Sequence, residues 1–444
     1  AGTPLFVQAP PAPLDRIPRR FRPLIHRALQ EGVITRCGRP AFTGNWPRIP
    51  AFTFQTSFGT IASGYDLNEE IAATKALAEL FERYSLGVYD PRNFIKGSWS
   101  SLQHRGALDP RLFSSFSKNQ LKEQAYERHR FNKYSEFMWA SCISLHRRQT
   151  HLIPAQLVYF RYQHQPNEPQ IRQGTTNGAA AGNSWEMAAY HAICENIERD
   201  ALMIHWLNRI TPPQLHPTEL KRLGNQKINQ LLDLYEGCDT RLSLLDITTD
   251  IGVPVILALV QDSSPGRPVA FVSVRADVDI EAAITGALTD GLRAGTWPDV
   301  TSKKIDNVRR KFPNIETIQD RHVYWGQREL APEIAFLAAG PFRDIRPRER
   351  TREWESQENK LQMLGKALRR KWLDVFIADT TSPIARAAGL TVLMSIIPGL
   401  YPLYLNEHFK YLGIKRLYEA PVAMDALRKP KQEEEMNPIP HPML

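Results

Sequence analysis

Apolar and polar positions along the chain predict a protein in which helices and strands alternate. Two stretches, 68–87 and 185–208, carry apolar residues at helical spacing, and Asn68 with its two following glutamates favours a helix start. Residues 52–63 are rich in Thr, Ser and Phe with few charges, which predicts a strand and turn. The small-residue run 175–184 opens the second helix. Each long helix is therefore expected to follow a segment that allows close backbone approach.

The remaining pattern predicts a strand-rich body. Alternating β-branched and aromatic residues over 138–145 and 152–160 predict a hairpin. Further strands are predicted over 242–248, 253–260, 269–274, 375–378 and 390–397, a helix over 280–294, and linkers or surface helices over 301–320 and 352–371. This alternation implies an α/β or α+β fold.

Both ends of the chain differ in composition from the middle. Residues 1–50 carry many prolines and a short amphipathic piece, 22–30, and we expect an N-terminal arm laid over the main body. Residues 51–427 then form the main domain. Residues 428–444 are charged and then proline-rich, which predicts an extended C-terminal tail rather than core.

The two long helices share a short pattern, Glu-x-x-Glu-Arg. Spacings of three and four place the two carboxylates and the guanidinium of each copy on one helix face, because a helix turns once per 3.6 residues. The residues are Glu79, Glu82 and Arg83 in the first helix, and Glu195, Glu198 and Arg199 in the second.

This pattern allows two interpretations. Carboxylates from two facing helices could hold Mg²⁺, with the arginines on the phosphates of a nucleotide. Alternatively, each copy is an ordinary helix with internal ion pairs, since Glu and Arg four residues apart stabilise a helix by roughly 0.2–0.5 kcal/mol. Both copies lie among apolar neighbours, where an unpaired carboxylate is costly, and this setting favours a binding site.

Composition narrows the class of protein. The chain has 444 residues, 42% of them hydrophobic, without an apolar run of membrane-spanning length or a secretory signal, so we expect a soluble cytoplasmic protein. The cysteines are far apart in sequence and are expected as buried thiols: Cys37, Cys142, Cys194 and Cys238. The net charge of +9 is spread along the chain, which disfavours nucleic acid and suits an anionic ligand such as a nucleotide or an acidic peptide.

Other candidate residues carry a weaker signal. His205 and His322 could act as acid or base, although a single histidine is more often a hydrogen-bonded structural residue. The sequence contains no Walker-type loop and no paired-cysteine or HExxH zinc pattern. The repeated pattern therefore remains the main candidate site.

The strings around the repeated pattern resemble the YcaO family. The likeness lies in Ser63-Gly-Tyr-Asp-Leu-Asn-Glu-Glu-Ile-Ala72 to Arg83, in Thr176-Asn-Gly-Ala-Ala-Ala-Gly-Asn183 to Asp200, and in later segments such as Ile397-Pro-Gly-Leu400 and Arg416-Leu-Tyr-Glu-Ala-Pro421. It covers roughly residues 55–444. The tail Asn437-Pro-Ile-Pro-His-Pro-Met-Leu444 is similar to the proline-alternating C-terminus of azoline-forming cyclodehydratases.

This resemblance implies a YcaO fold with mixed sheets, and an ATP and Mg²⁺ site between the two motif helices. The implied activity converts Cys, Ser or Thr of a ribosomally made precursor peptide to thiazoline or oxazoline by phosphorylating the backbone amide oxygen. The implied roles are metal ligands for Glu79, Glu82, Glu195 and Glu198, phosphate contacts for Arg83 and Arg199, nucleotide-pocket residues for Thr176, Asn177 and Asn183, and an active-site tail containing Pro438, Pro440 and Pro442, with the Leu444 carboxylate as candidate base.

The chain departs from the family pattern at several positions. Lys75 stands where many members carry Ser and could reach a phosphate. Gly64-Tyr65-Asp66 replaces a glycine-lysine-glycine element, and Met187, Arg293 and Trp297 also differ. These departures suggest one alternative, a catalytically weakened scaffold that binds peptide and partner. A second alternative within the family is another amide-activating reaction such as thioamide or macroamidine formation, although the proline tail is typical of azoline formation.

The resemblance also implies partners. Residues 1–50 are too few for the leader-binding domain of fused relatives, so a separate ThiF-like leader-binding protein is expected, with a flavin-dependent azoline dehydrogenase as a further partner. Neither nucleic acid nor a membrane is expected as a partner. The sequence leaves open whether the chain forms a homodimer.

Overall fold

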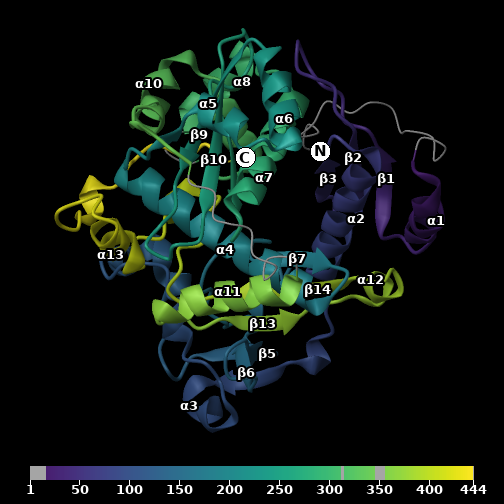
Figure 1. The fold of residues 1–444 in the computed structure, drawn as a ribbon. Coiled ribbons are helices and arrows are strands. Elements are labelled where there is room, and N and C mark those ends of the chain that lie inside the picture. The colour runs from purple at the N-terminus through teal and green to yellow at the C-terminus, as the bar shows by residue number, and fades with distance from the viewer. Residues whose placement is uncertain (1–16, 312–314, 346–355, 444) are drawn as a thin grey trace.

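Three β-sheets surround one long helix in the computed structural model, which describes residues 17–311, 315–345 and 356–443 (Figure 1). This central helix is α4 (Trp185–Asn208), and its start and end agree with the sequence-based prediction. Its packing partners are the strands β7 (Ala179–Gly182), β14 (Thr391–Ile396) and β11 (Phe271–Ala276) and the helices α11 (Gln357–Arg370) and α13 (Arg416–Ala423).

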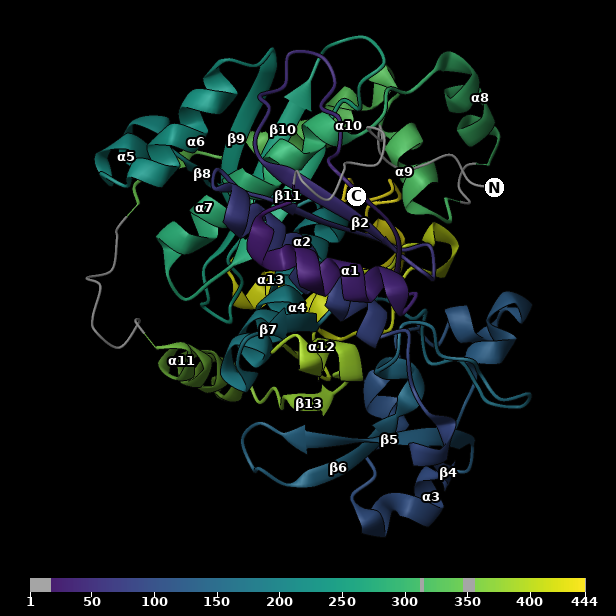
Figure 2. The same cartoon turned by 90° about the vertical axis from the view of Figure 1, so that its right-hand side faces the viewer.

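The first sheet supports the helix that carries the first motif. Its antiparallel strands are β1 (Ile34–Gly38), β2 (Ala51–Thr56) and β3 (Ile61–Tyr65), and helix α2 (Glu69–Ser85) lies across β2 and β3 (Figure 2). Asn68 begins α2 as predicted, since its side chain accepts hydrogen bonds from the backbone N–H groups of Glu70 and Ile71. The segment 1–50 contributes α1 (Arg22–Gln30) and, through β1, an edge strand of this sheet.

The second sheet carries the strand that reaches the second motif. Its strand order is β11, β10 (Val255–Asp262), β9 (Thr240–Asp246), β8 (Gln214–Leu215) and β12 (Phe342–Arg343). Helix α7 (Ile280–Gly291) packs on β10 and β11, and α5 (Pro217–Arg222) and α6 (Gln226–Glu236) lie beside it. The predicted strands and helix of this region are confirmed within a few residues.

The third sheet joins distant parts of the chain. Its order is β4 (Ile95–Ser98), β5 (Glu136–Ser144), β13 (Phe376–Asp379), β14 and β7, with β6 (Thr150–Pro154) paired to β5. The predicted hairpin is thus present, but its second strand was placed wrongly. It ends at Pro154, and a 3-10 helix over Ala155–Leu157 follows, because proline cannot donate to a ladder.

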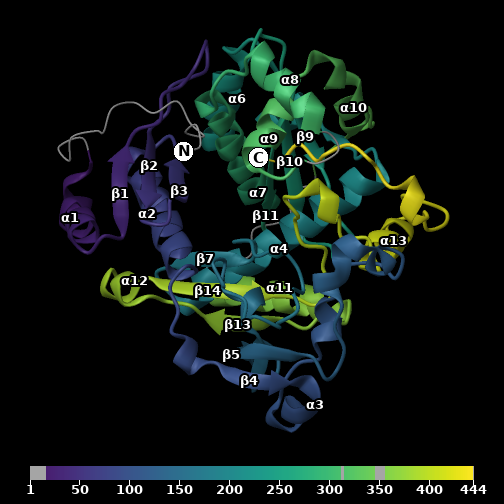
Figure 3. The same cartoon turned by 180° about the vertical axis from the view of Figure 1, so that it is seen from behind.

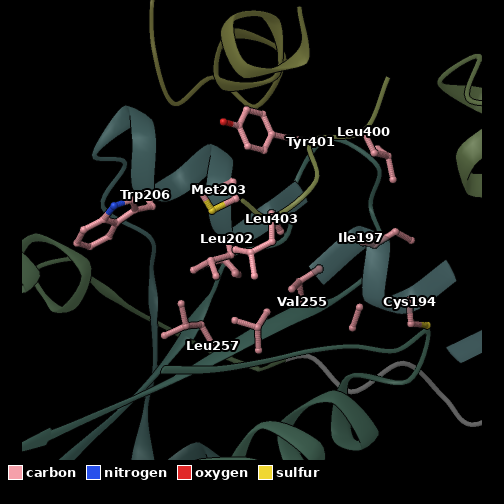
Figure 4. Close-up of a cluster of buried hydrophobic side chains, with 14 of the residues drawn as sticks. Cys194, Ile197, Leu202, Met203, Trp206, Val255, Leu257, Leu400, Tyr401 and Leu403 are labelled. Carbon is pink, nitrogen blue, oxygen red and sulfur yellow. The ribbon is translucent and has the colours of Figure 1, made fainter. Parts of the chain in front are cut away.

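Helix α4 is buried on nearly all sides. Figure 4 shows Cys194, Ile197, Leu202 and Met203 of this helix among side chains of β10 and of the segment 400–403. A helix with apolar residues all round belongs in the interior. The charged residues of its motif are therefore held inside the molecule.

The remaining helices are α3 (Trp99–Leu102), α8 (Ser302–Lys311), α9 (Ile318–Tyr324), α10 (Ala331–Ala335) and α12 (Pro383–Ala387). The basic stretch 301–320, predicted as a linker or surface helix, contains α8 and the start of α9. Helix α11 is no linker, because it buries Leu361, Leu364 and Leu368 in the main core.

The expectation that the C-terminal tail lies outside the core is wrong for residues 436–443. Met436, Asn437 and His441 are buried, and the yellow segment runs toward the middle of the molecule (Figures 1 and 3). Met443 forms a parallel bridge with Val272 of β11. The tail is extended, but it is part of the interior. Leu444 lies outside the described residues.

Two further expectations concern cysteines and membranes. The four cysteines are free; Cys142 and Cys194 are buried as expected, whereas Cys37 and Cys238 are only partly buried. Within the described part of the chain, no helix combines the length and apolar character needed to cross a membrane.

Candidate functional site

The two Glu-x-x-Glu-Arg motifs are built in the same way. The Glu79 carboxylate accepts a hydrogen bond of 2.6 Å from the backbone N–H of Ser63, and its other oxygen pairs with Arg83. The Glu195 carboxylate accepts one of 2.9 Å from the N–H of Gly178, and its other oxygen pairs with Arg199 at 2.8 Å. The structure thus contains the internal ion pairs that formed the simpler interpretation of the sequence.

The two motifs also approach each other across the helices. Both α2 and α4 pack against β7 and β14, so neighbouring strands position both. Burial raises the pKa of Glu82 well above its usual value, and the charges of Glu195 and Glu79 raise it further. The second carboxylate of α2 therefore lies close to the first carboxylate of α4, which isolated salt-bridged helices would not require.

Glu198 reaches the second sheet. It is 3% exposed and accepts a hydrogen bond of 3.0 Å from the N–H of Ala276 at the end of β11. Burial raises its pKa to about 7, although Arg275, at 3.9 Å, and Arg199, at 3.4 Å, both favour its charged form. Sequence reasoning missed Arg275, because no local signal shows that its strand ends at the motif helix.

The predicted nucleotide-pocket residues divide into two groups. Asn177 is beside the motif, because its amide oxygen accepts a hydrogen bond of 3.4 Å from Arg199 and its amide N–H donates to the Leu403 carbonyl. Thr176 precedes it in the same loop, where its carbonyl accepts the N–H of Ala179. Asn183 is exposed at the opposite end of β7. It follows Asn177 by six positions, so the two residues are at most about 20 Å apart at 3.3 Å per residue.

Lys75 and His191 occupy equivalent positions, four residues before the first glutamate of each motif. The Lys75 ammonium pairs with Asp66 at 2.9 Å, and Lys227 of α6 pairs with the same carboxylate at 3.0 Å. Burial lowers the pKa of His191 to about 4, and the nearby positive charges of Arg275, Lys360 and Lys75 lower it too. Each motif thus has a nitrogen-bearing side chain one turn before its first carboxylate, but the lowered pKa keeps the His191 ring neutral at neutral pH.

The other candidate residues have structural contacts. His205 contacts the Ala201 carbonyl, and His322 contacts the Pro298 carbonyl at 2.8 Å and stacks on Trp297. Both histidines are buried, which lowers the pKa of each to about 4. Arg293 lies near Tyr65, whose pKa it lowers against the larger effect of burial.

The donor set fits Mg²⁺ with a phosphate ligand. Among the residues that the structure describes, no three His, Cys, Asp or Glu side chains already converge as a metal cage. Mg²⁺ usually takes only one or two carboxylates and completes its shell with water and phosphate oxygens. Burial raises the pKa of Glu82 and Glu198, so their charged forms are disfavoured, and a bound cation would favour those charged forms.

Solved structures share this fold. A heterocyclase in complex with substrate and cofactor superposes with a TM-score of 0.75 at 22% identity, covering 94% of this chain and 57% of the heterocyclase. A YcaO protein from Methanopyrus kandleri bound with AMPPCP and Mg²⁺ has a TM-score of 0.61 at 16% identity, covering 88% of this chain and 92% of that one. The chain thus spans little more than half the length of that heterocyclase, and the predicted YcaO fold is confirmed.

Sequence comparison gives the family. An uncharacterised protein of Methanothermobacter thermautotrophicus is 25% identical over 371 residues, which cover 83% of this chain and 87% of that protein. A model of the family described as YcaO cyclodehydratase, ATP- and Mg²⁺-binding, matches residues 63–401. The match confirms ATP and Mg²⁺ as cofactors and favours an enzyme over a scaffold. Since it spans well over half of the chain, this protein belongs to the YcaO family of ATP- and Mg²⁺-binding cyclodehydratases.

Proposed function

We propose that the chain converts Cys, Ser or Thr residues of a ribosomally made precursor peptide into thiazoline or oxazoline rings. The side-chain sulfur or oxygen of the substrate attacks the preceding amide carbon. The amide oxygen then leaves as phosphate while the amide nitrogen loses its proton and forms a double bond to that carbon. ATP bound with Mg²⁺ supplies the phosphoryl group that makes this oxygen a leaving group. The protein's part is positioning and charge stabilisation.

The packing of α2 and α4 against the same two strands, β7 and β14, carries this proposal, and the charge of Glu195 on α4 raises the pKa of Glu82 on α2. The motif on each helix carries two carboxylates and one arginine, and burial opposes the negative charge of Glu82, which suits a metal–phosphate complex that would draw the carboxylates together. We assign Glu79, Glu82, Glu195 and Glu198 as candidate metal ligands. Arg83 and Arg199 would contact phosphate, and Lys75, Thr176 and Asn177 would line the nucleotide pocket. Asn183, exposed at the opposite end of β7, is not assigned to this pocket.

The tail is the candidate for the peptide chemistry. Met443 pairs with Val272 of β11. Val272 lies four residues along this strand from Ala276, whose N–H donates to Glu198, and this separation is about 13 Å at 3.3 Å per residue. The alternation of Pro438, Pro440 and Pro442 removes backbone donors from the tail. We propose that the carboxylate of Leu444, beyond the described residues, serves as the base that accepts the nucleophile's proton.

We further propose that this reaction takes place in the cytoplasm, with a ThiF-like protein that binds the leader of the precursor and a flavin-dependent dehydrogenase that oxidises the rings. Incubation of the chain with precursor, leader-binding protein, ATP and Mg²⁺ tests the activity by mass spectrometry. The expected product has lost one water per ring. Exchange of oxygen for sulfur would identify thioamide formation instead, and ring formation that survives Glu79→Ala and Glu198→Ala would refute the metal-site assignment.

A further inference from the structure

Helix α11 ends in an unusual residue, Trp372. The N–H of Trp372 donates to the Arg369 carbonyl at 3.0 Å, and the N–H of Leu373 donates to the Leu368 carbonyl at 3.1 Å. This pair of hydrogen bonds is the Schellman motif, which places the residue just after the helix cap in the left-handed conformation. Trp372 accordingly has φ +59°. Glycine is the residue that usually occupies this position, because it lacks a Cβ atom.

The tryptophan gains no packing within the chain in return. Its side chain is 94% exposed, whereas the neighbouring Leu373 and Leu368 are buried in the same hydrophobic cluster. A left-handed backbone and a solvated indole are both unfavourable. The described structure therefore gives Trp372 no stabilising role, and exposed tryptophan is among the residues most enriched at protein-binding hot spots.

The surroundings of Trp372 are basic. Residues 366–374 contain Lys366, Arg369, Arg370 and Lys371 against a single acid, Asp374. Arg369 and Arg370 are exposed and form no ion pair with the residues that the structure describes. Asp374 lies beside His146 of the β5–β6 turn and raises its pKa against the larger effect of burial. This exposed segment, 369–372, is called the Trp372 surface below.

The Trp372 surface is connected to the motif helix by ion pairs. Lys371 pairs with Asp250 at 3.1 Å, and Asp250 pairs with Arg416 at 2.7 Å. Arg416 in turn pairs at 2.8 Å with Asp200, which directly follows Arg199. A protein that docks here would lie on the structural unit that holds α4.

We propose that the Trp372 surface docks an acidic segment of the leader-binding partner protein, with the indole as its apolar anchor and Arg369 and Arg370 as its charge contacts. The identity of the partner rests on the proposed function. The chemistry of the surface favours this occupant, because a central tryptophan with an arginine rim combines a hot-spot anchor with complementary charge for an acidic protein surface.

The test measures affinity between the full-length chain and the purified leader-binding protein, without ATP or precursor, at low and high salt. Trp372→Gly should weaken binding by about 30-fold. It should leave the thermal midpoint equal or higher, since glycine suits the left-handed position. Arg369→Ser with Arg370→Ser should reduce the salt dependence of binding. Tyr134→Ala serves as matched control, because Tyr134 is 65% exposed but lies in another loop.

Equal affinity of the wild type and Trp372→Gly, or no binding by the wild type, overturns the proposal. Binding to anionic vesicles or to duplex DNA that depends equally on Trp372 also overturns the proposal, because it would identify a membrane or nucleic-acid surface. Because binding is read without turnover, a failure of ring formation and a failure of docking give separate results.

Discussion

Glu82 on α2 and Glu195 on α4 lie close enough that the charge of Glu195 raises the pKa of Glu82. These carboxylates come from motifs more than a hundred residues apart in sequence. Like charges in a buried setting oppose folding, so their retention is best understood through what they bind. A cation between the helices would turn this repulsion into binding energy.

Glu82→Gln removes one of these charges and keeps the shape of the side chain. Without Mg²⁺ we expect the variant to unfold at the same temperature as the wild type or higher, because burial and two neighbouring carboxylates oppose the Glu82 charge. MgATP should stabilise the wild type by about 2.7 kcal/mol at a hundred times Kd, and the variant much less. Thermal unfolding with EDTA and with MgATP measures both effects.

The same variant should lose ATP turnover by about 100-fold, as expected for a group that organises charge in the transition state. Glu70→Gln is the control, since Glu70 lies on the same helix but is exposed and pairs only at the surface with Arg20. A Glu82→Gln variant with normal MgATP stabilisation would contradict the metal-ligand assignment.

Arg199→Met should show how much this arginine stabilises the two carboxylates of the second motif. Arg199 is largely buried and pairs with Glu195 and Glu198, so its loss should cost roughly 3 kcal/mol of folding free energy. Mg²⁺ should restore part of this loss, because the cation can replace the missing positive charge. Urea unfolding with and without Mg²⁺ reads the effect. Arg309→Met removes an exposed ion pair with Glu329 and a hydrogen bond to the Gln327 side chain, and should cost about 1 kcal/mol, with no Mg²⁺ dependence.

Gly178→Ala tests whether the backbone N–H of Gly178 positions the Glu195 carboxylate. Gly178 has φ +86°, and an added Cβ atom would lie 2.4 Å from the Ser395 carbonyl oxygen. The resulting shift should move the N–H that Glu195 accepts and weaken ATP binding by about tenfold or more. Gly252→Ala is the control, since Gly252 has φ +76° but open space around its Cα. It should cost about 1 kcal/mol of stability and leave ATP binding unchanged. Equal ATP affinity in both variants would show that the Gly178 N–H does not position Glu195.

Local sequence signals predicted the helices that carry the site. Asn68 and Ser184 cap α2 and α4, and the apolar residues around both motifs indicated their burial. Contacts from distant segments were not predictable in this way. The N–H groups of Ser63 and Gly178 bind the first glutamates, and Arg275 reaches Glu198 from a strand, because sheet topology brings these groups together.

The tail misled sequence reasoning for a physical reason. Charged and proline-rich residues are typical of solvated segments. Here the body satisfies the tail's carbonyls with side-chain donors: Lys410 donates to Asn437 and Pro438, Trp206 to Ile439, and Arg321 to His441. A chain with few N–H groups of its own can be buried once such donors are present. Composition cannot show where those donors lie.

His322 should make folding sensitive to acid. Its folded pKa of about 4 lies below the ordinary value of 6.5, so the unfolded chain binds a proton more readily over this window. Stability is therefore full above pH 6.5 and falls as the pH drops toward 4, by up to about 3 kcal/mol from this group. His322→Gln keeps a donor for the Pro298 carbonyl but cannot be protonated in this range. Urea unfolding at about pH 7 and at about pH 4 should show a smaller loss of folding free energy in the variant than in the wild type. An unchanged loss would assign the acid sensitivity to other groups.

Trp206→Phe should release the tail while leaving the nucleotide site intact. The Trp206 indole N–H donates to the Ile439 carbonyl at 2.9 Å, and phenylalanine removes this donor at a cost of about 1–3 kcal/mol including the lost volume. If the tail completes the peptide chemistry, ring formation should slow while MgATP affinity stays normal, and hydrogen exchange over residues 437–443 should accelerate. Trp325→Phe is a closely matched control, because Trp325 is equally buried and packs edge-on against Trp206 at 5.8 Å, but its indole N–H has no hydrogen-bond partner among the described residues. Faster exchange of the tail without slower ring formation would remove the tail from the mechanism and leave the catalytic base to be sought on the motif helices.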